Sequence, residues 1–232
     1  RPSSWRSGTA KTAMAQPPRI VIFAKAPVAG LAKTRLIPAL GAQGAARLAA
    51  TMLNHAVEQA LASEVGPVEL CVTPAPQDAM WAGLLPRHAA LTFSDQGDGD
   101  LGERMAQAAQ RVLATQRNVI LIGTDCPSLD AATLRHAAEK LEQQLEQQLA
   151  QHDAVIIPAS DGGYVLLGLR RFDRSLFEGI AWSSATVCAD TLQRLQALNW
   201  SICTLPTLHD IDEPEDLQHL PADWQADFHF DF

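Results

Sequence analysis

The sequence has no excess of basic residues and no long apolar run. It carries 18 lysine and arginine residues against 26 aspartate and glutamate residues, a formal net charge of −8 over 232 residues. A nucleic-acid-binding protein should show a basic face, so this balance argues against that class. A membrane helix needs about 18 consecutive apolar residues, and no run approaches that length. We therefore expect a protein that binds neither nucleic acid nor membrane.

Closely spaced cysteines and a signal peptide are also missing. The four cysteines are far apart, with no Cys-x-x-Cys pair. This spacing argues against a zinc ribbon, and a disulfide framework is not expected in a chain of this length. Free thiols in a reducing cytosol are the simpler interpretation, so we expect a cytoplasmic protein. Residues 1–18 lack a signal-peptide core, and we expect a disordered leader or an expression remnant there, followed by one domain over residues 19–232.

Strand-like and helix-like segments alternate along the chain. Strands are expected at residues 19–23, 68–72, 90–93, 118–123, 153–159, 163–169 and 201–205. Helices are expected at residues 43–62, 77–85, 101–114, 130–151 and 184–198, with an acidic tail helix from residue 213. The alternation predicts an α/β fold with a mixed, mostly parallel sheet covered by helices on both faces. The turn "SDGG" is too short for a crossover helix, so its two flanking strands should pair antiparallel or diverge at an edge.

The segment "VILIGTDCPSLD" ends an apolar strand with the lone carboxylate of Asp125. The loop cannot be helical there, because Cys126 precedes Pro127. In such sheets ligands bind beyond the carboxyl ends of the strands, which is where Asp125 falls. Mg²⁺ commonly takes one or two carboxylates together with substrate oxygens. Asp125 is therefore either a turn residue or a metal ligand.

The segment "AKAPVAGLAKTRL" follows the first strand and gathers positive charge. It places Lys25, Lys33 and Arg35 around Pro27 and Gly30. Backbone amides of a glycine-containing loop can approach an anion, and the cations can neutralise it. The segment is neither a Walker A loop nor G-x-G-x-x-G, which disfavours an NTPase. A basic surface loop is the alternative, but the acidity of the rest of the chain favours a phosphate site.

Two glycine-rich segments are further candidates. In "DQGDGDLGERM", amides at a helix start near Leu101 could hold a phosphate or a base edge. A flexible acidic loop with capping aspartates explains the same residues equally well. In "SDGGYVLLGL", Asp161 and two glycines form a tight turn that would let a sugar or base come close. An ordinary Asp-Gly hairpin turn is the equally weighted alternative.

The segment "HDIDEPEDL" carries Asp210 and Asp212 ahead of Pro214, which could open a helix. The acids that follow favour a helix N-terminus electrostatically. Helix capping explains some of these acidic residues but not all of them. For Asp212 the more specific interpretation is that its carboxylate is a second ligand of the metal ion. Alternate residues of an extended segment point to opposite faces, so the sequence leaves open which aspartate faces the metal.

These five segments, in this order, resemble small bacterial GT-A-type glycosyltransferase-like proteins often named arsenosugar-biosynthesis glycosyltransferases. The resemblance covers about residues 19–220 and is specific as a set. More distantly, the sequence is similar to 2-phospholactate guanylyltransferase and molybdenum-cofactor nucleotidyltransferases. The resemblance implies a single-domain nucleotide-diphospho-sugar transferase (GT-A) fold with Mg²⁺ or Mn²⁺ as cofactor. Two departures stand out: "GTDCP" has one acid where Asp-x-Asp is usual, and "APVAGLAKTR" replaces the G-G-x-G-x-R start of nucleotidyltransferases.

The resemblance also implies site residues. The metal falls on Asp125 and on Asp212, where Glu213 replaces the usual Thr of D-T-P-E-D-L. Asp161 is the candidate to orient or deprotonate an acceptor hydroxyl, and Lys25, Lys33 and Arg35 would stabilise phosphate charge. The expected nucleotide-binding residues are Ala24, Lys25, Pro27, Gly30, Lys33, Arg35, Gly97, Gly102, Gly123, Thr124 and Asp125. The expected acceptor-binding residues are Gly162, Gly163, Tyr164 and Trp182.

Three functions follow from this interpretation. The leading one is a metal-dependent glycosyltransferase-like enzyme that uses a nucleotide-activated sugar and a small-molecule acceptor. The second is a nucleotidyltransferase that moves NMP from an NTP to a phosphorylated acceptor and releases pyrophosphate. The third is a non-catalytic nucleotide-binding protein, because fold does not fix function. Whether the chain forms a homodimer stays open.

Overall fold

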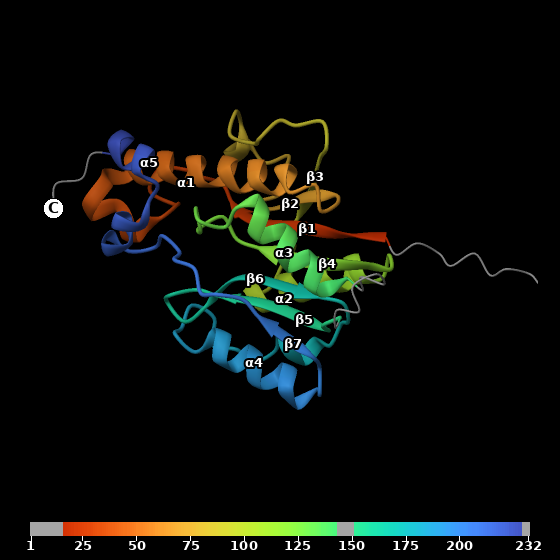
Figure 1. Cartoon of the computed structure of the whole chain (residues 1–232). Coiled ribbons are helices and arrows are strands. Elements are labelled where there is room, and N and C mark those ends of the chain that lie inside the picture. Colours follow the sequence, from red (N-terminus) through yellow and green to blue (C-terminus); the bar gives the residue numbers. More distant parts are fainter. Residues whose placement is uncertain (1–15, 143–150, 229–232) are drawn as a thin grey trace, which may run out of the picture.

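The computed structural model describes residues 16–142 and 151–228, which form a seven-stranded sheet covered by helices (Figure 1). The sheet order is β3-β2-β1-β4-β6-β5-β7. The strands are β1 (Gln16–Lys25), β2 (Val68–Thr73), β3 (Leu91–Asp95), β4 (Arg117–Ile122), β5 (Ala154–Pro158), β6 (Tyr164–Leu169) and β7 (Ile202–Thr204). The α-helices are α1 (Ile37–Ala62), α2 (Leu101–Leu113), α3 (Ala131–Leu141), α4 (Val187–Ala197) and α5 (Ala222–Asp227).

The strand pairing confirms the prediction of a mixed, mostly parallel sheet. β1 pairs parallel with β2 and β4, β2 with β3, and β5 with β7. β6 runs antiparallel to both β4 and β5. The antiparallel pairing of β5 with β6 agrees with the short turn between them, which leaves no room for a crossover helix.

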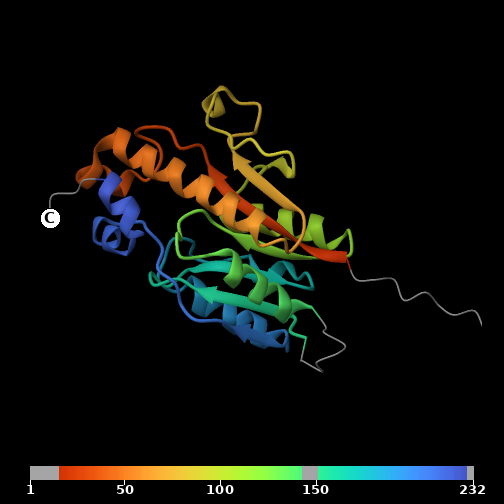
Figure 2. The same cartoon turned by 45° about the horizontal axis from the view of Figure 1, so that its top comes forward.

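Alternating side chains of the strands form two apolar layers, one on each face of the sheet. On one face, residues such as Ile20, Leu70 and Ile120 pack against α1 and α3. On the other face, residues such as Val21 and Leu121 pack against α2 and α4. Figure 2 shows α1 and α3 on one side of the sheet and α4 on the other. The prediction that helices cover both faces is therefore confirmed.

The C-terminal segment packs on the first part of α1. Ile211, Leu217 and Phe228 are buried against Leu36 and Leu48 in a third apolar cluster. Figures 1 and 2 both show α5 beside the start of α1. The predicted tail helix is instead a 3₁₀-helix over Pro214–His219 followed by the short α5. This packing carries the "HDIDEPEDL" segment to the loop that follows β1.

Several element boundaries differ from the prediction. β1 begins at Gln16 rather than at residue 19. α1 begins at Ile37 with a proline in its first turn, but it is kinked at Gly41 (φ +67°, ψ 166°), so the helix beyond the kink agrees with the predicted residues 43–62. The helix expected at residues 77–85 shrinks to one 3₁₀ turn, Ala79–Trp81, which is soon followed by Gly83 at φ +74°. α3 ends at Leu141 because the next residue is extended. The rest of the helix expected through residue 151 falls largely on residues 143–150, outside the described residues.

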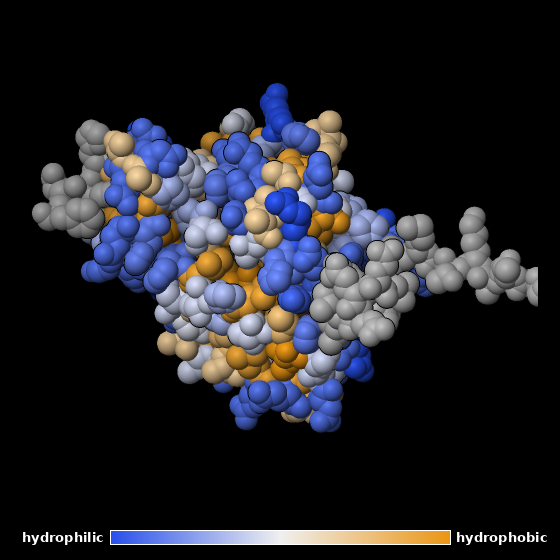
Figure 3. Space-filling model, viewed as in Figure 1, coloured by the Kyte–Doolittle hydropathy of each residue, from blue (hydrophilic) through white to orange (hydrophobic). Residues whose placement is uncertain are grey.

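The remaining bulk predictions concern thiols and membranes. All four cysteines are unpaired. Within residues 16–142 and 151–228, no helix is long and apolar enough to cross a membrane. In the view of Figure 3, hydrophilic side chains cover much of the surface, with apolar patches between them.

Candidate functional site

The carboxyl ends of β1 and β4 open onto two adjoining cavities. The first, of about 560 Å³, is named the basic cavity because Lys25, Lys33 and Arg35 line it with Ala24, Thr73 and Gln96. The second, of about 330 Å³, is named the acidic cavity because Asp210 lines it with Met105, Tyr164, Trp182 and Val187. Both are also lined by Phe23, Leu101, Asp125, Asp161, Ser183 and Asp212. The two cavities are therefore adjacent, and residues far apart in the chain line both of them.

Lys33 joins the two carboxylates that were predicted to bind metal. Its Nζ lies 3.0 Å from Asp125 Oδ1 and 3.3 Å from Asp212 Oδ1, and it donates to the Ile211 carbonyl at 2.6 Å. The side chain is only 9% exposed. Burial alone would lower the pKa of Lys33, but the Asp125 and Asp212 carboxylates outweigh it and raise that pKa above its ordinary value. The charged Lys33 side chain thus links the loop after β1 to the loop after β4 and to the C-terminal segment.

The other two cations of the first loop differ in their partners. Arg35 Nη1 lies 2.5 Å from Asp212 Oδ2 and 3.3 Å from Glu213 Oε1. Lys25 is exposed at the end of β1 and lines the basic cavity. Two of the three predicted phosphate-binding cations therefore contact the predicted metal carboxylates, and Lys25 makes no ion pair among the described residues.

Asp161 lies in a tight turn and lines both cavities. The Gly163 amide donates to Asp161 Oδ1 at 2.7 Å, and the Cys188 amide donates to the Gly162 carbonyl at 2.9 Å. Gly162 has φ +92°, and a Cβ there would lie 2.1 Å from the Ala185 carbonyl oxygen. Only glycine fits this position, so Gly162 shapes the turn behind the cavity, whereas Gly163 lines it.

Asp210 and Asp212 take different places, which the sequence left open. Asp212 lines both cavities and contacts Lys33, whereas Asp210 lines only the acidic cavity. Asp210 Oδ1 accepts a hydrogen bond from Ser160 Oγ at 3.3 Å. Burial, and then the nearby Asp161 carboxylate, raise the pKa of Asp210 above its ordinary value.

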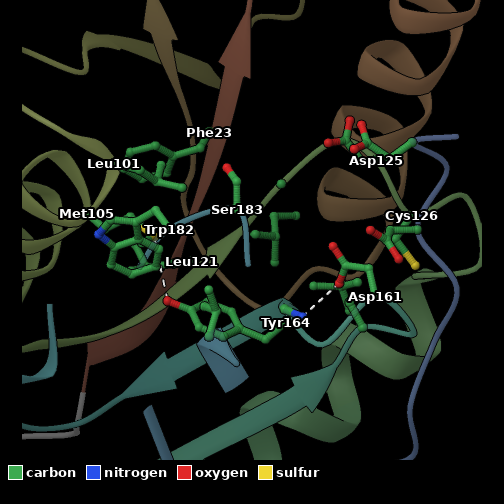
Figure 4. Close-up of a pocket in the computed structure, with 18 of the residues that line it drawn as sticks. Phe23, Leu101, Met105, Leu121, Asp125, Cys126, Asp161, Tyr164, Trp182 and Ser183 are labelled. Carbon is green, nitrogen blue, oxygen red and sulfur yellow. Dashed lines mark hydrogen bonds between the residues drawn. The ribbon is translucent and has the colours of Figure 1, made fainter. Parts of the chain in front are cut away.

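Aromatic side chains close the far end of the acidic cavity (Figure 4). Tyr164 Oη lies 3.8 Å from Met105 Sδ, and burial raises the pKa of this phenol. A Cβ on Gly102 would lie 2.6 Å from Trp182 Nε1 and 2.4 Å from the Phe177 carbonyl oxygen. Gly102 was predicted to bind nucleotide; the structure places it behind Trp182, where its missing side chain makes room for the indole.

The other predicted nucleotide residues divide into two groups. Ala24 and Thr124 line the basic cavity, and Gly123 lines the acidic one. Pro27, Gly30 and Gly97 are not among the residues that line either cavity. Pro27 is buried, and Gly30 and Gly97 have φ of +81° and +78°, so these two glycines form turns.

The predicted site residues included neither Gln96 nor Ser183, and each of them lines a cavity. Gln96 is buried, and its Nε2 donates to the Ala24 carbonyl at 3.0 Å and to the Cys71 carbonyl at 3.1 Å. Its only sequence signal was its place beside a glycine-rich loop at the end of a strand. Ser183 lines both cavities with φ +64°, an uncommon conformation for a residue that is not glycine. Nothing in the sequence indicates that conformation.

The donor set restricts what kind of metal ion could bind. Among the described residues, no three or more His, Cys, Asp or Glu side chains gather closely enough to hold a metal ion. Asp125 and Asp212 do converge on one ammonium group. Mg²⁺ is often held by one or two carboxylates plus substrate phosphates. These residues therefore fit an ion completed by a substrate and do not fit an ion held by the protein alone.

Comparison with known proteins gives the family and the fold. Residues 56–184 match DUF2064, a family described as uncharacterized proteins conserved in bacteria, and the chain belongs to this family. A crystal structure from Desulfovibrio desulfuricans G20, described as a candidate nucleotide-diphospho-sugar transferase, is 29% identical with a TM-score of 0.77 and covers 90% of each chain. No curated protein is significantly similar in sequence.

A synthase and a synthetase share the fold at lower identity. The 4-diphosphocytidyl-2C-methyl-D-erythritol synthase of Anaerococcus prevotii DSM 20548 is 12% identical, with a TM-score of 0.56 and coverage of 91% of this chain and 99% of that one. CMP:2-keto-3-deoxy-manno-octonic acid synthetase, in complex with CTP, is also 12% identical, with a TM-score of 0.53 and coverage of 90% and 99%. The predicted nucleotide-diphospho-sugar transferase fold is therefore confirmed.

Proposed function

We propose that the protein is a glycosyltransferase-like enzyme that moves a sugar from a nucleoside-diphosphate sugar to a small acceptor, with Mg²⁺ or Mn²⁺ as cofactor. The observation that carries this proposal is the pair of adjoining cavities, one lined by cations and one by apolar and acidic side chains. They share Asp125, Asp161 and Asp212, so two substrates could meet at one set of carboxylates. The relative from Desulfovibrio desulfuricans supports the choice of donor class.

The donor nucleotide would occupy the basic cavity. Lys25 is exposed there and free to approach a diphosphate, and Lys33 and Arg35 would add fixed positive charge nearby. Cations that are already in place when the leaving diphosphate gains charge lower the barrier without further reorganisation. Gln96, held by two backbone carbonyls, would keep the floor of the cavity rigid beneath the nucleotide.

Asp125 and Asp212 would hold the divalent ion together with the donor phosphates. When bound, the ion would supply Lewis-acid stabilisation of the charge on the leaving diphosphate. Lys33 now neutralises both carboxylates at 3.0 and 3.3 Å, so it would have to share them or release them when the ion and donor enter. The ion pairs of Lys33 thus hold the Asp125 and Asp212 carboxylates close together before the ion and donor bind.

Asp161 would position and deprotonate the acceptor hydroxyl. The Gly163 amide fixes Oδ1 at 2.7 Å, which leaves Oδ2 to meet the acceptor. In the transfer, the hydroxyl proton passes to Asp161 and the hydroxyl oxygen forms a bond to the anomeric carbon. The bond from that carbon to the diphosphate breaks, and the nucleoside diphosphate leaves with the electron pair.

The test is a thermal-shift and calorimetric titration with UDP-, GDP- and dTDP-sugars and with NTPs, each with and without Mn²⁺. A ligand at a hundred times its dissociation constant should stabilise the fold by about 2.7 kcal/mol. We expect Mn²⁺-dependent stabilisation by one diphospho-sugar in the wild type, its loss in Asp125→Ala, and no change in the matched control Asp98→Ala, an exposed acid outside both cavities.

Other outcomes of that titration would replace the proposal. Stabilisation by a bare NTP, with pyrophosphate released when an acceptor is added, would make the protein a nucleotidyltransferase. Nucleotide binding without metal dependence or turnover would make it a binding protein. No response to any nucleotide would remove the donor site altogether.

A further inference from the structure

The acidic cavity has two halves of opposite character. One half is apolar and is lined by Phe23, Leu101, Met105, Tyr164, Trp182 and Val187. The other half carries the carboxylates of Asp125, Asp161, Asp210 and Asp212. Figure 4 shows Trp182, Met105 and Leu101 on one side of the space and Asp125 and Asp161 on the other. A molecule that fills this cavity would meet an apolar wall at one end and acids at the other.

The apolar half is built to receive a flat apolar body. Leu101 is 43% exposed, one of few large hydrophobic side chains that the described residues leave exposed, and it lines both cavities. Because Gly102 has no side chain, the indole of Trp182 lies directly against α2 at the apolar end of the cavity. The Tyr164 hydroxyl turns towards Met105. Aromatic and aliphatic walls of this kind bind aromatic or aliphatic ligand bodies.

Lys33 pairs with Asp125 and Asp212, which are also the proposed metal ligands, so the unpaired negative charge that the described residues give the acidic half comes from Asp161 and Asp210. Among the described residues that line the cavity there is no Lys, Arg or His. Within the described part of the chain no ion pair reaches Asp161 or Asp210. A phosphate or carboxylate placed here would face the like charges of Asp161 and Asp210, and their repulsion disfavours it. A cation would be attracted.

We propose that the acceptor is a small neutral or cationic hydroxyl compound with an aromatic-sized apolar body, and that phosphorylated and carboxylate acceptors are excluded. This inference rests on the proposed function, because it identifies the acidic cavity as the acceptor site. The cavity, at about 330 Å³, lies at the lower end of the range for ligand pockets, so the acceptor is small. The basic cavity shares three of these carboxylates but also carries Lys25, Lys33 and Arg35, so the anionic donor is favoured there over the acidic cavity.

The test uses three probes of nearly the same shape that differ in charge. Tyramine is cationic, tyrosol is neutral and 4-hydroxyphenylacetate is anionic, and each is titrated calorimetrically into the wild-type protein. We expect tyramine to bind most tightly, tyrosol next, and the acid at least about tenfold more weakly than tyramine, which corresponds to about 1.4 kcal/mol. Equal or tighter binding of the acid, or no binding of any probe at millimolar concentration, would overturn the inference.

Variants of cavity residues test whether the three probes bind in the acidic cavity. Asp210→Asn should reduce the preference for tyramine over tyrosol, and Trp182→Ala should weaken all three probes by about tenfold. Asp98→Asn, outside both cavities, is the matched control and should change neither. Unchanged probe binding in both site variants would place the probes elsewhere and overturn the inference. Titration with the diphospho-sugar is run on the same samples: if the donor fails to bind while the probes follow the expected order, the proposed function fails and the charge preference stands.

Discussion

Lys33→Met removes the ammonium group that joins the two predicted metal carboxylates. A hydrogen bond involving a charged group contributes about 1.5–3 kcal/mol, which applies to the bond to the Ile211 carbonyl. The pairs with Asp125 and Asp212 add at most about 1 kcal/mol, because those side chains are 50% and 36% exposed. Methionine also avoids the cost of burying an ammonium group. We therefore expect a net loss of about 1–2 kcal/mol, or about 4 °C in melting temperature.

The more informative effect of Lys33→Met concerns the metal. In the wild type a divalent ion must take both carboxylates from Lys33, whereas in the variant they are free. We expect Mn²⁺ to bind about tenfold more tightly to the variant, a difference of about 1.4 kcal/mol. Free Mn²⁺ is counted by electron paramagnetic resonance while the ion is titrated into protein that holds the diphospho-sugar donor but no acceptor, so the result does not depend on turnover.

Two controls decide what a change in Mn²⁺ binding means. Lys25→Met removes a cation from the same cavity that makes no ion pair among the described residues, and it should leave Mn²⁺ affinity unchanged. Adding Asp125→Asn to Lys33→Met should abolish the gain. If wild type and Lys33→Met bind Mn²⁺ equally, Asp125 and Asp212 are not the metal carboxylates and the reasoning is refuted.

Three further predictions test other parts of the structure. Gly102→Ala should displace Trp182, costing about 1–3 kcal/mol by overpacking and raising the KM for acceptor more than that for donor, as measured by steady-state kinetics. Asp161→Asn should lower kcat at least about a hundredfold with donor affinity kept, and full turnover would end its role as base. Glu69→Gln should cost about 2 kcal/mol by denaturation at neutral pH, because the 3% exposed carboxylate loses its ion pair with Arg111, whose own partial exposure limits the loss. Burial alone would raise the pKa of Glu69, but hydrogen bonds from Arg111 and Ser94 hold that pKa below its ordinary 4.5. The difference in unfolding free energy between wild type and Glu69→Gln should therefore shrink as the pH falls below 4.5. A difference that stays constant with pH would contradict an ionic origin of the stabilisation.

The sequence predicted the sheet and placed Asp125 at the edge where the two cavities lie, because both follow from local patterns. Apolar runs separated by amphipathic helices require a covered, mostly parallel sheet, and the short turn at Asp161 required an antiparallel pair. A lone carboxylate after the fourth strand could be placed at the binding edge for the same reason. Asp125 does line both cavities.

What the sequence could not predict depends on contacts between distant segments. Lys33 meets Asp212 across 179 positions, and no local pattern shows that a cation expected on phosphate instead ties two carboxylates together. The left-handed backbone of Ser183 and the buried amide of Gln96 are set by packing around them. Gly102 looked like a phosphate-loop glycine, but the neighbour that requires it, Trp182, lies in another part of the chain.

The bond from Lys33 to Ile211 also makes the site depend on a segment that is synthesised late. Asp212 is made long after the strands that frame the basic cavity, and the Ile211 amide reaches its partner, the Asp125 carbonyl at 2.8 Å, only when the late segment docks. A nascent chain that has not yet produced this segment holds one carboxylate and a lysine without two of its three partners. The charge pattern of the site is therefore complete only when the C-terminal segment is docked on the loops that follow β1 and β4.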